Sequence, residues 1–120
     1  MEKLEKYLEY FKNVKDTKES GKRVVEYNED GSVSIFVVLN EKLSSFISDF
    51  YDSNIWDKSY KEHMNILGDR VNKLNSLTKE ELATVLTYHI RMDRFFEGHL
   101  MSVANDGQLY EILKKLLNYE

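Results

Sequence analysis

The chain has 120 residues, of which 42% are hydrophobic and 32% charged, and its net charge is −4. This length and composition predict one soluble globular domain over residues 1–120, large enough to fold without a metal or a disulfide. The absence of cysteine excludes disulfides, thiol catalysis and cysteine-ligated metals. Lys and Arg are scattered among the acids, so we expect no basic face for duplex nucleic acid.

The apolar runs are too short to cross a membrane. The longest, Ile35 to Leu39, is far below the ~20 residues that a spanning helix needs. The first residues, Met-Glu-Lys-Leu-Glu-Lys, carry early acids and do not resemble a signal peptide. We therefore expect a cytoplasmic protein without a membrane partner. The use of Lys, Asn and Tyr and the absence of Pro are compatible with an AT-rich genome, and we place the protein in a bacterium or in a bacterium infected by a phage.

The first predicted element is an amphipathic helix. Apolar residues recur at helical spacing, with Glu and Lys between them, at Leu4, Tyr7, Leu8, Phe11 and Val14. The polar face mixes both signs of charge, which favours packing on a core over lying on a membrane. The helix is expected to end near Gly21.

A β-hairpin is predicted next. Two β-branched runs, Arg23 to Tyr27 and Ser32 to Leu39, flank Asp30-Gly31, which is a strong turn signal. Alternation places four apolar residues on one face, namely Val33, Ile35, Val37 and Leu39. Because a lone hairpin is marginal in water, we expect helices to cover this face.

Helices are predicted for the rest of the chain. Asn40 can cap a helix whose stripe is Leu43, Phe46, Ile47, Phe50 and Tyr51, and Ser53-Asn54 ends it. A second stripe runs through Trp56, Tyr60, Met64 and Leu67 to a stop at Gly68, and residues 69–77 are irregular.

The last third begins with a capping box. The side chains of Thr78 and Glu81 can each accept a hydrogen bond from the other residue's backbone amide at the start of a helix. Helical spacing then continues from Leu82, and no residue up to Glu97 requires the helix to end. Asn105-Asp106-Gly107 indicates a helix end, and Leu109 to Leu117 form a final helix. The predicted fold is α+β and predominantly helical, with five or six helices and one β-hairpin in a single compact domain.

One stretch, Leu86 to Leu100, concentrates most of the chemistry. Its Leu86-Thr87, Arg91, Arg94-Phe95 and Glu97-Gly98, with Asp106-Gly107 and the Leu-rich stretch 113–116, form a pattern. This pattern resembles that of domain-of-unknown-function family 6508, a family of small bacterial and phage proteins. Met92 stands where members often carry Gly, and Phe96 where they often carry Cys. The resemblance implies a shared fold and a shared site, with no reaction or substrate attached.

The candidate site in this stretch is a ligand-binding one. On an uninterrupted helix, Thr84, Thr87, Arg91, Arg94 and Gly98 lie along one face. Arginine suits carboxylates and phosphates, and Phe95 offers a surface on which a base can stack. We therefore expect an anionic, nucleotide-like ligand at Arg91, Arg94, Phe95, Thr87, Glu97, Gly98 and His99.

A purely structural interpretation of the same residues remains open. Arg94 can pair with Glu97, and Arg91 can reach Glu111 or the acids of the first helix. Phe95 and Phe96 can belong to the core, and Gly98 can serve helix packing.

Metal binding and catalysis are the weaker hypotheses. His89, Asp93 and Glu97 are four residues apart, but the interleaved arginines repel a cation, and we expect no metal and no cofactor. His99 near Glu97 could act as an acid–base pair, and Ser102 follows His99 by three residues. No reaction-specific motif accompanies them, so an enzyme ranks last.

The aromatic residues suggest protein interactions as an alternative. Tyr88, Phe96, Tyr110 and Tyr119 are candidates for partial exposure, and such residues are favoured at interface centres. The leading hypothesis is a non-catalytic protein that binds an anionic, nucleotide-like ligand at Arg91, Arg94 and Phe95. A phage-encoded version would act by sequestering such a signal or by blocking a host defence factor. The alternative is a protein–protein inhibitor or adaptor without a small ligand. Both hypotheses are compatible with a homo-oligomer.

Overall fold

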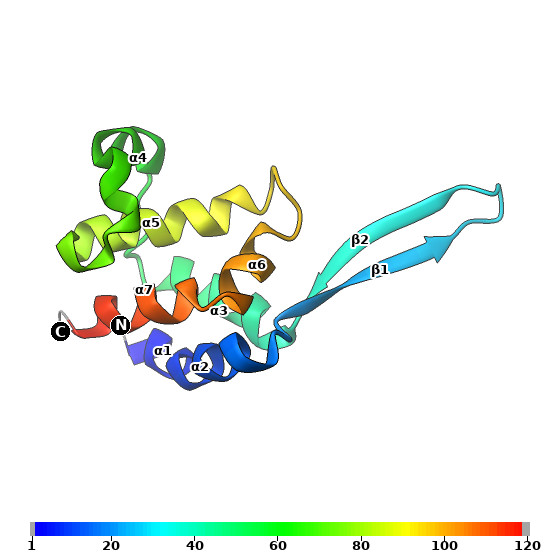
Figure 1. Ribbon diagram of the computed structural model, residues 1–120, viewed down its shortest axis with the longest axis horizontal. Coiled ribbons are helices and arrows are strands. Elements are labelled where there is room, and N and C mark those ends of the chain that lie inside the picture. Colours follow the sequence, from blue (N-terminus) through cyan, green and yellow to red (C-terminus); the bar gives the residue numbers. More distant parts are fainter. Residues whose placement is uncertain (1, 119–120) are drawn as a thin grey trace.

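The computed structural model describes residues 2–118, which form a helical body and a projecting β-hairpin (Figure 1). The predicted class, α+β and predominantly helical with one hairpin, is confirmed. The helix count is six when α1 and α2, which are separated by Lys6 alone, are taken together. In chain order the elements are α1 (Glu2–Glu5), α2 (Tyr7–Thr17), β1 (Gly21–Tyr27), β2 (Val33–Leu39), α3 (Glu41–Asp52), α4 (Tyr60–Leu67), two 3₁₀ turns (Gly68–Asn72 and Leu74–Ser76), α5 (Lys79–Met92), α6 (His99–Asn105) and α7 (Gln108–Asn118).

The core lies between the helices of the body. The predicted apolar stripes of α2, α3, α5 and α7 all face it, and Phe11, Phe46, Leu86 and Leu113 are fully buried. The ring of Phe11 meets that of Phe46 edge to face, 4.8 Å between centroids. These helices therefore cover one another's apolar faces, which leaves little apolar surface for any other element.

The hairpin is predicted correctly, but its cover is not. β1 and β2 pair antiparallel from Gly21↔Leu39 to Tyr27↔Val33, and the turn closes between Asn28 and Ser32. We expected helices over the apolar face, and this is wrong for its outer half, where Val33 and Ile35 are exposed. Within this face of β2, the half-buried residues are Val37 and Leu39, at the base of the hairpin.

The hairpin projects because both of its ends leave the body at one point. The amide of Asn40 donates to the carbonyl of Ser20, which closes the hairpin at its base. Ser20 is fully buried, and its hydroxyl donates to Asn105 Oδ1 on α6 at 2.7 Å. From this anchor the strands run outward past the ends of the helices (Figure 1). We refer to residues 21–39 as the arm.

Two predicted helix ends are corrected. α5 ends at Met92 and does not continue to Glu97, because residues 93–98 turn to serve other elements. Asp93 Oδ1 accepts from the amide of Leu100 at 3.0 Å, Glu97 Oε1 accepts from the amide of Val37 at 2.8 Å, and Gly98 has a φ of +92°. Likewise α4 begins at Tyr60, so Trp56 precedes it.

The predicted caps are confirmed. The side chain of Asn40 accepts from the amide of Lys42 at 2.9 Å, and Thr78 and Glu81 form the complete capping box. α2 ends earlier than expected, at Thr17, where Lys18 adopts the left-handed conformation. Over the described residues, no helix combines the length and the apolar character that crossing a membrane requires.

Candidate functional site

A basic pocket of about 500 Å³ opens between the start of α4 and the end of α5. Its lining brings together Arg91, Arg94 and Phe95 with residues that precede and begin α4, namely Lys58, Ser59, Tyr60, Lys61 and Glu62. Four cationic side chains thus face one carboxylate. A concave surface with this excess of one sign attracts the opposite charge, here an anion. We refer to it as the basic pocket.

Arg91 is held in place by aromatic rings. Its guanidinium carbon lies 5.2 Å from the ring centroid of Trp56 and 5.5 Å from that of Tyr51. These cation–π contacts orient the guanidinium without neutralising it. Its Nε is buried and has no hydrogen-bond partner among residues 2–118. The side chain is therefore fixed and charged, with donor capacity that the described part of the chain does not use.

The ion pairs that a structural role would require are not formed within the described range. Neither Arg91 nor Arg94 pairs with an acid of residues 2–118, where the ion pairs are Lys6–Asp49, His63–Asp57 and Arg70–Glu81. Glu97, the expected partner of Arg94, bonds to the backbone of β2 instead. Phe95 and Phe96 are 63% and 65% exposed, so they do not belong to the core.

The other predicted site residues lie elsewhere. Thr87 is fully buried, where its hydroxyl donates to the carbonyl of Ala83 and accepts from the amide of Asp57. Gly98 is buried against Arg23 and Val37 of the arm, and an added Cβ would lie 3.4 Å from the Arg23 guanidinium. His99 contacts His89. The structure therefore gathers Arg91, Arg94 and Phe95 into one pocket but not Thr87, Glu97, Gly98 or His99.

Asp57 holds the wall of the basic pocket against α5. One of its carboxylate oxygens accepts from the Thr84 hydroxyl and from His63 Nδ1, each at 2.5 Å, and the other accepts from the Ser59 amide. Burial alone raises the pKa of this carboxyl, but the hydrogen bonds from Thr84, His63 and Ser59 outweigh burial and lower it. Asp57 therefore stays ionised and fixes its neighbours Trp56 and Lys58.

The same carboxylate lies at the edge of a second, more apolar pocket. This pocket, of about 400 Å³, is lined by Ile55, Asp57, His63, Lys79, Glu80, Ala83, Thr84 and Leu116. A carboxylate that orients an imidazole is a common acid–base arrangement. No Ser, Cys or metal cluster accompanies it in this lining, so the pair defines no reaction.

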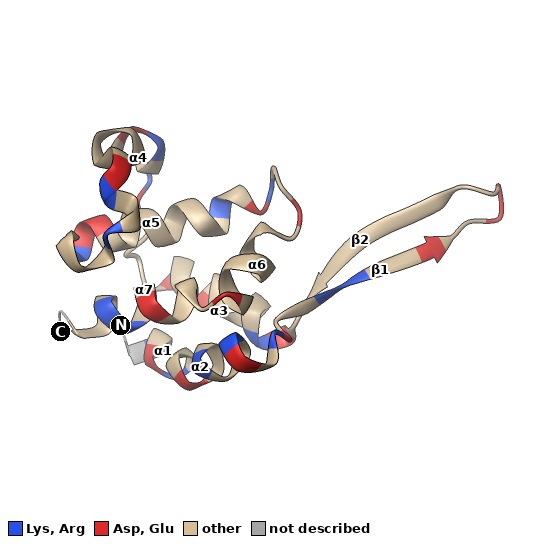
Figure 2. Ribbon diagram, viewed as in Figure 1, with Lys and Arg blue, Asp and Glu red and all other residues tan. Residues whose placement is uncertain are grey.

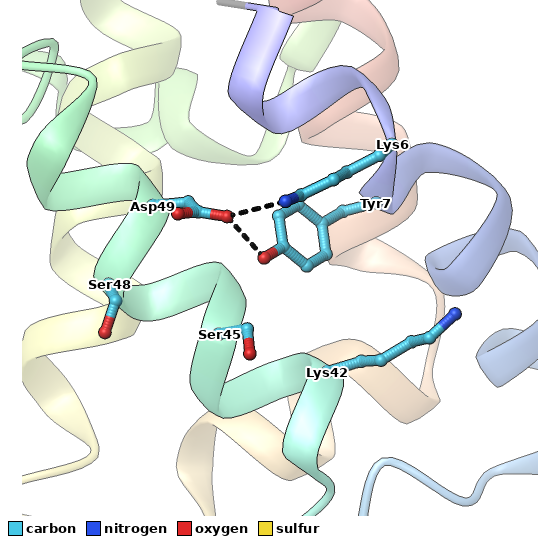
Figure 3. A pocket seen from close by; sticks show the side chains of 6 residues that line it. All are labelled: Lys6, Tyr7, Lys42, Ser45, Ser48 and Asp49. Carbon is cyan, nitrogen blue, oxygen red and sulfur yellow. Dashed lines mark hydrogen bonds and ion pairs between the residues drawn. The ribbon is translucent and has the colours of Figure 1, made fainter.

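A third pocket lies between the start of α2 and α3 (Figure 3). Here Asp49 Oδ2 accepts from the Tyr7 hydroxyl at 2.6 Å and from Lys6 Nζ at 3.2 Å. Burial, and then the carboxylate of Asp49, raise the pKa of Tyr7 to about 12. The acid and the phenol satisfy each other, so this pocket is less suited to bind a charged ligand than the basic pocket is.

His89 and His99 form a stacked pair between α5 and α6. Their Nδ1 and Nε2 atoms lie 3.0 Å apart, and the rings are tilted by 28°. Burial, followed by the neighbouring His99, lowers the pKa of His89 to about 4, against an opposing effect of Asp106. The three residues weighed as metal ligands, His89, Asp93 and Glu97, each have another partner. Residues 2–118 contain no group of three His, Asp or Glu arranged to hold a metal.

Sequence reasoning missed half of the basic pocket. No motif marks Lys58 and Lys61, although two lysines three apart at a helix start present one face. The platform of Tyr51 and Trp56 was assigned to apolar stripes, because helical spacing alone cannot tell a core aromatic ring from one beneath a cation. Of the aromatic residues expected to be partly exposed, Tyr88 and Tyr110 are half-buried as expected, Phe96 is exposed, and Tyr119 lies outside the described residues.

The fold and the pocket define a small helical α+β protein with a projecting hairpin and a basic pocket. The family model described as "Family of unknown function (DUF6508)" matches residues 1–120, the whole chain. The chain belongs to this family. No curated protein and no solved structure matches it in the corresponding searches.

Proposed function

We propose that the protein binds an anionic, nucleotide-like ligand in the basic pocket and does so without catalysis. The observation that carries the proposal is the set of unpaired arginines. Arg91 and Arg94 line one pocket with Lys58 and Lys61, and neither arginine has a carboxylate partner among residues 2–118.

The two arginines have different parts in this proposal. Arg91, oriented by Trp56 and Tyr51, is the fixed cation, and a preorganised guanidinium loses little entropy when it binds an oxyanion. Arg94 lies in the turn after α5 and is exposed, so it can close over the ligand. Forked contacts from guanidinium groups to phosphate oxygens are among the stronger hydrogen bonds in proteins.

Phe95 supports a nucleotide over a simple anion. Its ring is 63% exposed and lines the same pocket as the cations, so a base can stack on it while the phosphates meet the arginines. Such stacking contributes about 1–3 kcal/mol per base, and it tolerates different bases. In a phage-encoded chain the site would serve to sequester a nucleotide signal of the host.

Thermal unfolding against a ligand panel tests the proposal. The panel contains nucleoside mono- and diphosphates and cyclic nucleotides, with inorganic phosphate and pyrophosphate as controls for charge alone. A true ligand raises the unfolding temperature because it binds only the folded state, and at 100 times its Kd it adds ~2.7 kcal/mol to the free energy of unfolding.

Variants identify the groups that bind. Arg94→Ala should leave the unliganded stability nearly unchanged, and Arg91→Ala should cost about 1 kcal/mol through the lost cation–π contacts. Both should abolish the ligand-induced shift, while Lys12→Ala, an exposed cation of α2 outside the pocket, should keep it. No shift for any ligand in the wild type would contradict the proposal.

The alternative is a protein–protein inhibitor or adaptor. It is favoured by the adjacent Phe95 and Phe96, which both expose more than half of their surface. Exposed aromatic pairs of this kind are typical of interface centres. This alternative would be supported if the wild type responded to no nucleotide and the Phe96→Ala variant lost binding to a protein partner.

A further inference from the structure

The outer half of the arm exposes an apolar face that no other part of residues 2–118 covers. The pairing places Val25 beside Ile35 and Tyr27 beside Val33, so these four side chains share the outer half of one face. Ile35 is 63% exposed and Tyr27 83%. A two-stranded hairpin is marginally stable in water unless its apolar face packs against something. The arm therefore has the properties of an interface element.

The charges of the arm restrict what can cover it. The turn at its tip carries Glu29 and Asp30 and is red in Figure 2, while Lys22 and Arg23 lie at its base. An acidic tip is repelled by nucleic acid and by anionic lipid. It fits a protein surface with an apolar strip that ends in cations.

This chain itself has such a surface. Glu97 bonds to the amide of Val37 at 2.8 Å, so the loop from Asp93 to Gly98 lies against the base of the arm. That loop carries the exposed cation Arg94 and the exposed rings of Phe95 and Phe96. The base of the arm and this loop together carry three cations, Lys22, Arg23 and Arg94, against two acids, Asp93 and Glu97, whose carboxylates accept from backbone amides. The apolar strip thus has an acidic tip and a base with an excess of one cation.

We propose that two copies of the chain dimerise through their arms, packed face to face and antiparallel about a two-fold axis. A strand of seven residues spans roughly 23 Å, so the tip of one arm reaches the base of the other. The Glu29 and Asp30 end of each copy then meets the Arg94 loop of its partner, and the four apolar side chains of each arm are covered. In a two-fold arrangement the contact between tip and loop occurs twice, once at each end of the interface, as in other self-complementary interfaces.

The dimer does not depend on the proposed ligand, although Arg94 takes part in both. Its support is the exposed face and the distribution of charge on the arm. A failure of nucleotide binding would leave the dimer intact, and a monomeric protein would still have both Arg91 and Arg94 in the basic pocket for a nucleotide.

Light scattering of the purified protein tests the assembly. The wild type should have twice the 14.2 kDa mass of one chain. Ile35→Asp should be monomeric, because it places a charge in the middle of the covered face. The matched control is Ile66→Asp on α4, which makes the same change at a side chain that is 78% exposed off the arm and should remain dimeric.

Circular dichroism should show unchanged helix content in both variants, because neither side chain belongs to the core. A wild type that stays monomeric at every concentration overturns the proposal and points to a different protein as the partner. A dimer that persists in Ile35→Asp equally overturns it.

A charge exchange tests the antiparallel arrangement. Glu29→Lys places a cation at the tip, and Arg94→Glu places an acid in the loop, so each variant alone has like charges at both contacts and should dimerise at least tenfold more weakly. Glu29 is preferred to Asp30 because Asp30 Oδ1 accepts from the Ser32 amide and holds the turn. In a mixture, the heterodimer has opposite charges at both contacts and should form at the wild-type affinity. If mixing the two variants does not restore dimerisation, the tip and the loop do not meet and the proposed antiparallel arrangement is wrong.

Discussion

Two buried hydroxyl groups on α5 organise the segment that precedes α4. Thr84 donates to the carboxylate of Asp57, and Thr87 accepts from the backbone amide of the same residue. Both threonines belong to the small set of buried polar residues in the described chain. Each hydroxyl also lies within hydrogen-bond distance of a backbone carbonyl one turn earlier on α5, that of Glu80 or Ala83, so both are satisfied while they hold Asp57 in place. Through Asp57, α5 sets the place of Trp56 and Lys58 in the basic pocket.

Thr84→Val should measure the strength of this attachment. Valine keeps the shape of the side chain but removes the donor to an ionised carboxylate, and a hydrogen bond to a charged group contributes about 1.5–3 kcal/mol. We expect a loss of that size in the free energy of unfolding, measured in urea. Thr17→Val, at the exposed end of α2, should change it by less than ~0.5 kcal/mol. Equal effects at both positions would mean that Asp57 does not depend on Thr84.

The His89–His99 pair makes stability depend on pH. Burial and the neighbouring imidazole lower the pKa of His89 to about 4 in the folded protein, whereas the unfolded chain keeps the ordinary value of 6.5. Between these two values the unfolded state binds a proton that the folded state does not. Stability is therefore complete above about pH 6.5 and falls as the pH is lowered toward 4.

The size of the loss follows from the shift. One pKa unit corresponds to about 1.4 kcal/mol, so we expect a loss on the order of 2–3 kcal/mol across this window, measured by urea unfolding at a series of pH values. His89→Gln keeps a hydrogen-bonding side chain beside His99 but cannot titrate, so it should flatten the dependence. His63→Gln is the control and should retain it. The same slope in His89→Gln would assign the effect to other groups.

Local patterns predicted the elements well where local physics decides them. The capping box at Thr78, the cap at Asn40 and the turn at Asp30-Gly31 are all present, since each depends on residues within a few positions. The end of α5 was wrong because tertiary contacts decide it. The carboxylates of Asp93 and Glu97 accept hydrogen bonds from amides of α6 and β2. The spacing of apolar residues along one helix gives no information about such contacts.

The exposed arm could not be predicted from its own residues. The alternation of Val33, Ile35, Val37 and Leu39 indicates a face that prefers cover, but it does not say what covers it. The helices of the body bury one another, and both ends of the hairpin leave from Ser20 and Asn40 at one point. The outer half of this face needs cover and finds none among residues 2–118, which is consistent with the proposed dimer.

The candidate site was predicted only in part for a related reason. Helical spacing predicts Arg91 and Arg94 as neighbours on one helix, yet they share a pocket because the chain turns after Met92 and the segment before α4 folds back on α5. Lys58 and Lys61 join them from about thirty residues away in the chain. Helical spacing cannot indicate such a contact, and no single residue in that segment identifies it.

At the scale of the molecule, the chain consists of a body and an arm of different contact density. The principal extents are 52 × 30 × 25 Å, and the arm accounts for the long axis (Figure 1). The strands contact each other far more than they contact any helix, whereas α5 touches α4, α6 and α7. Elements with few buried contacts open at lower free energy than the core does. The body and the arm should therefore unfold as separate cooperative units.

Native-state hydrogen exchange can separate these two units. The monomeric Ile35→Asp variant is the appropriate sample, because dimerisation of the wild type would protect the arm. We expect amides of the outer strands to exchange through local opening, at a low free energy that hardly changes with denaturant. Amides of α5 and α7, around Leu86 and Leu113, should exchange only through global unfolding, with a steep dependence on denaturant. If the strands showed the same free energy and the same dependence as α5, the arm would be part of one cooperative unit with the body. In the wild type, protection of the arm should then rise with protein concentration while that of α5 stays limited by global unfolding, because only the arm gains cover from a second copy.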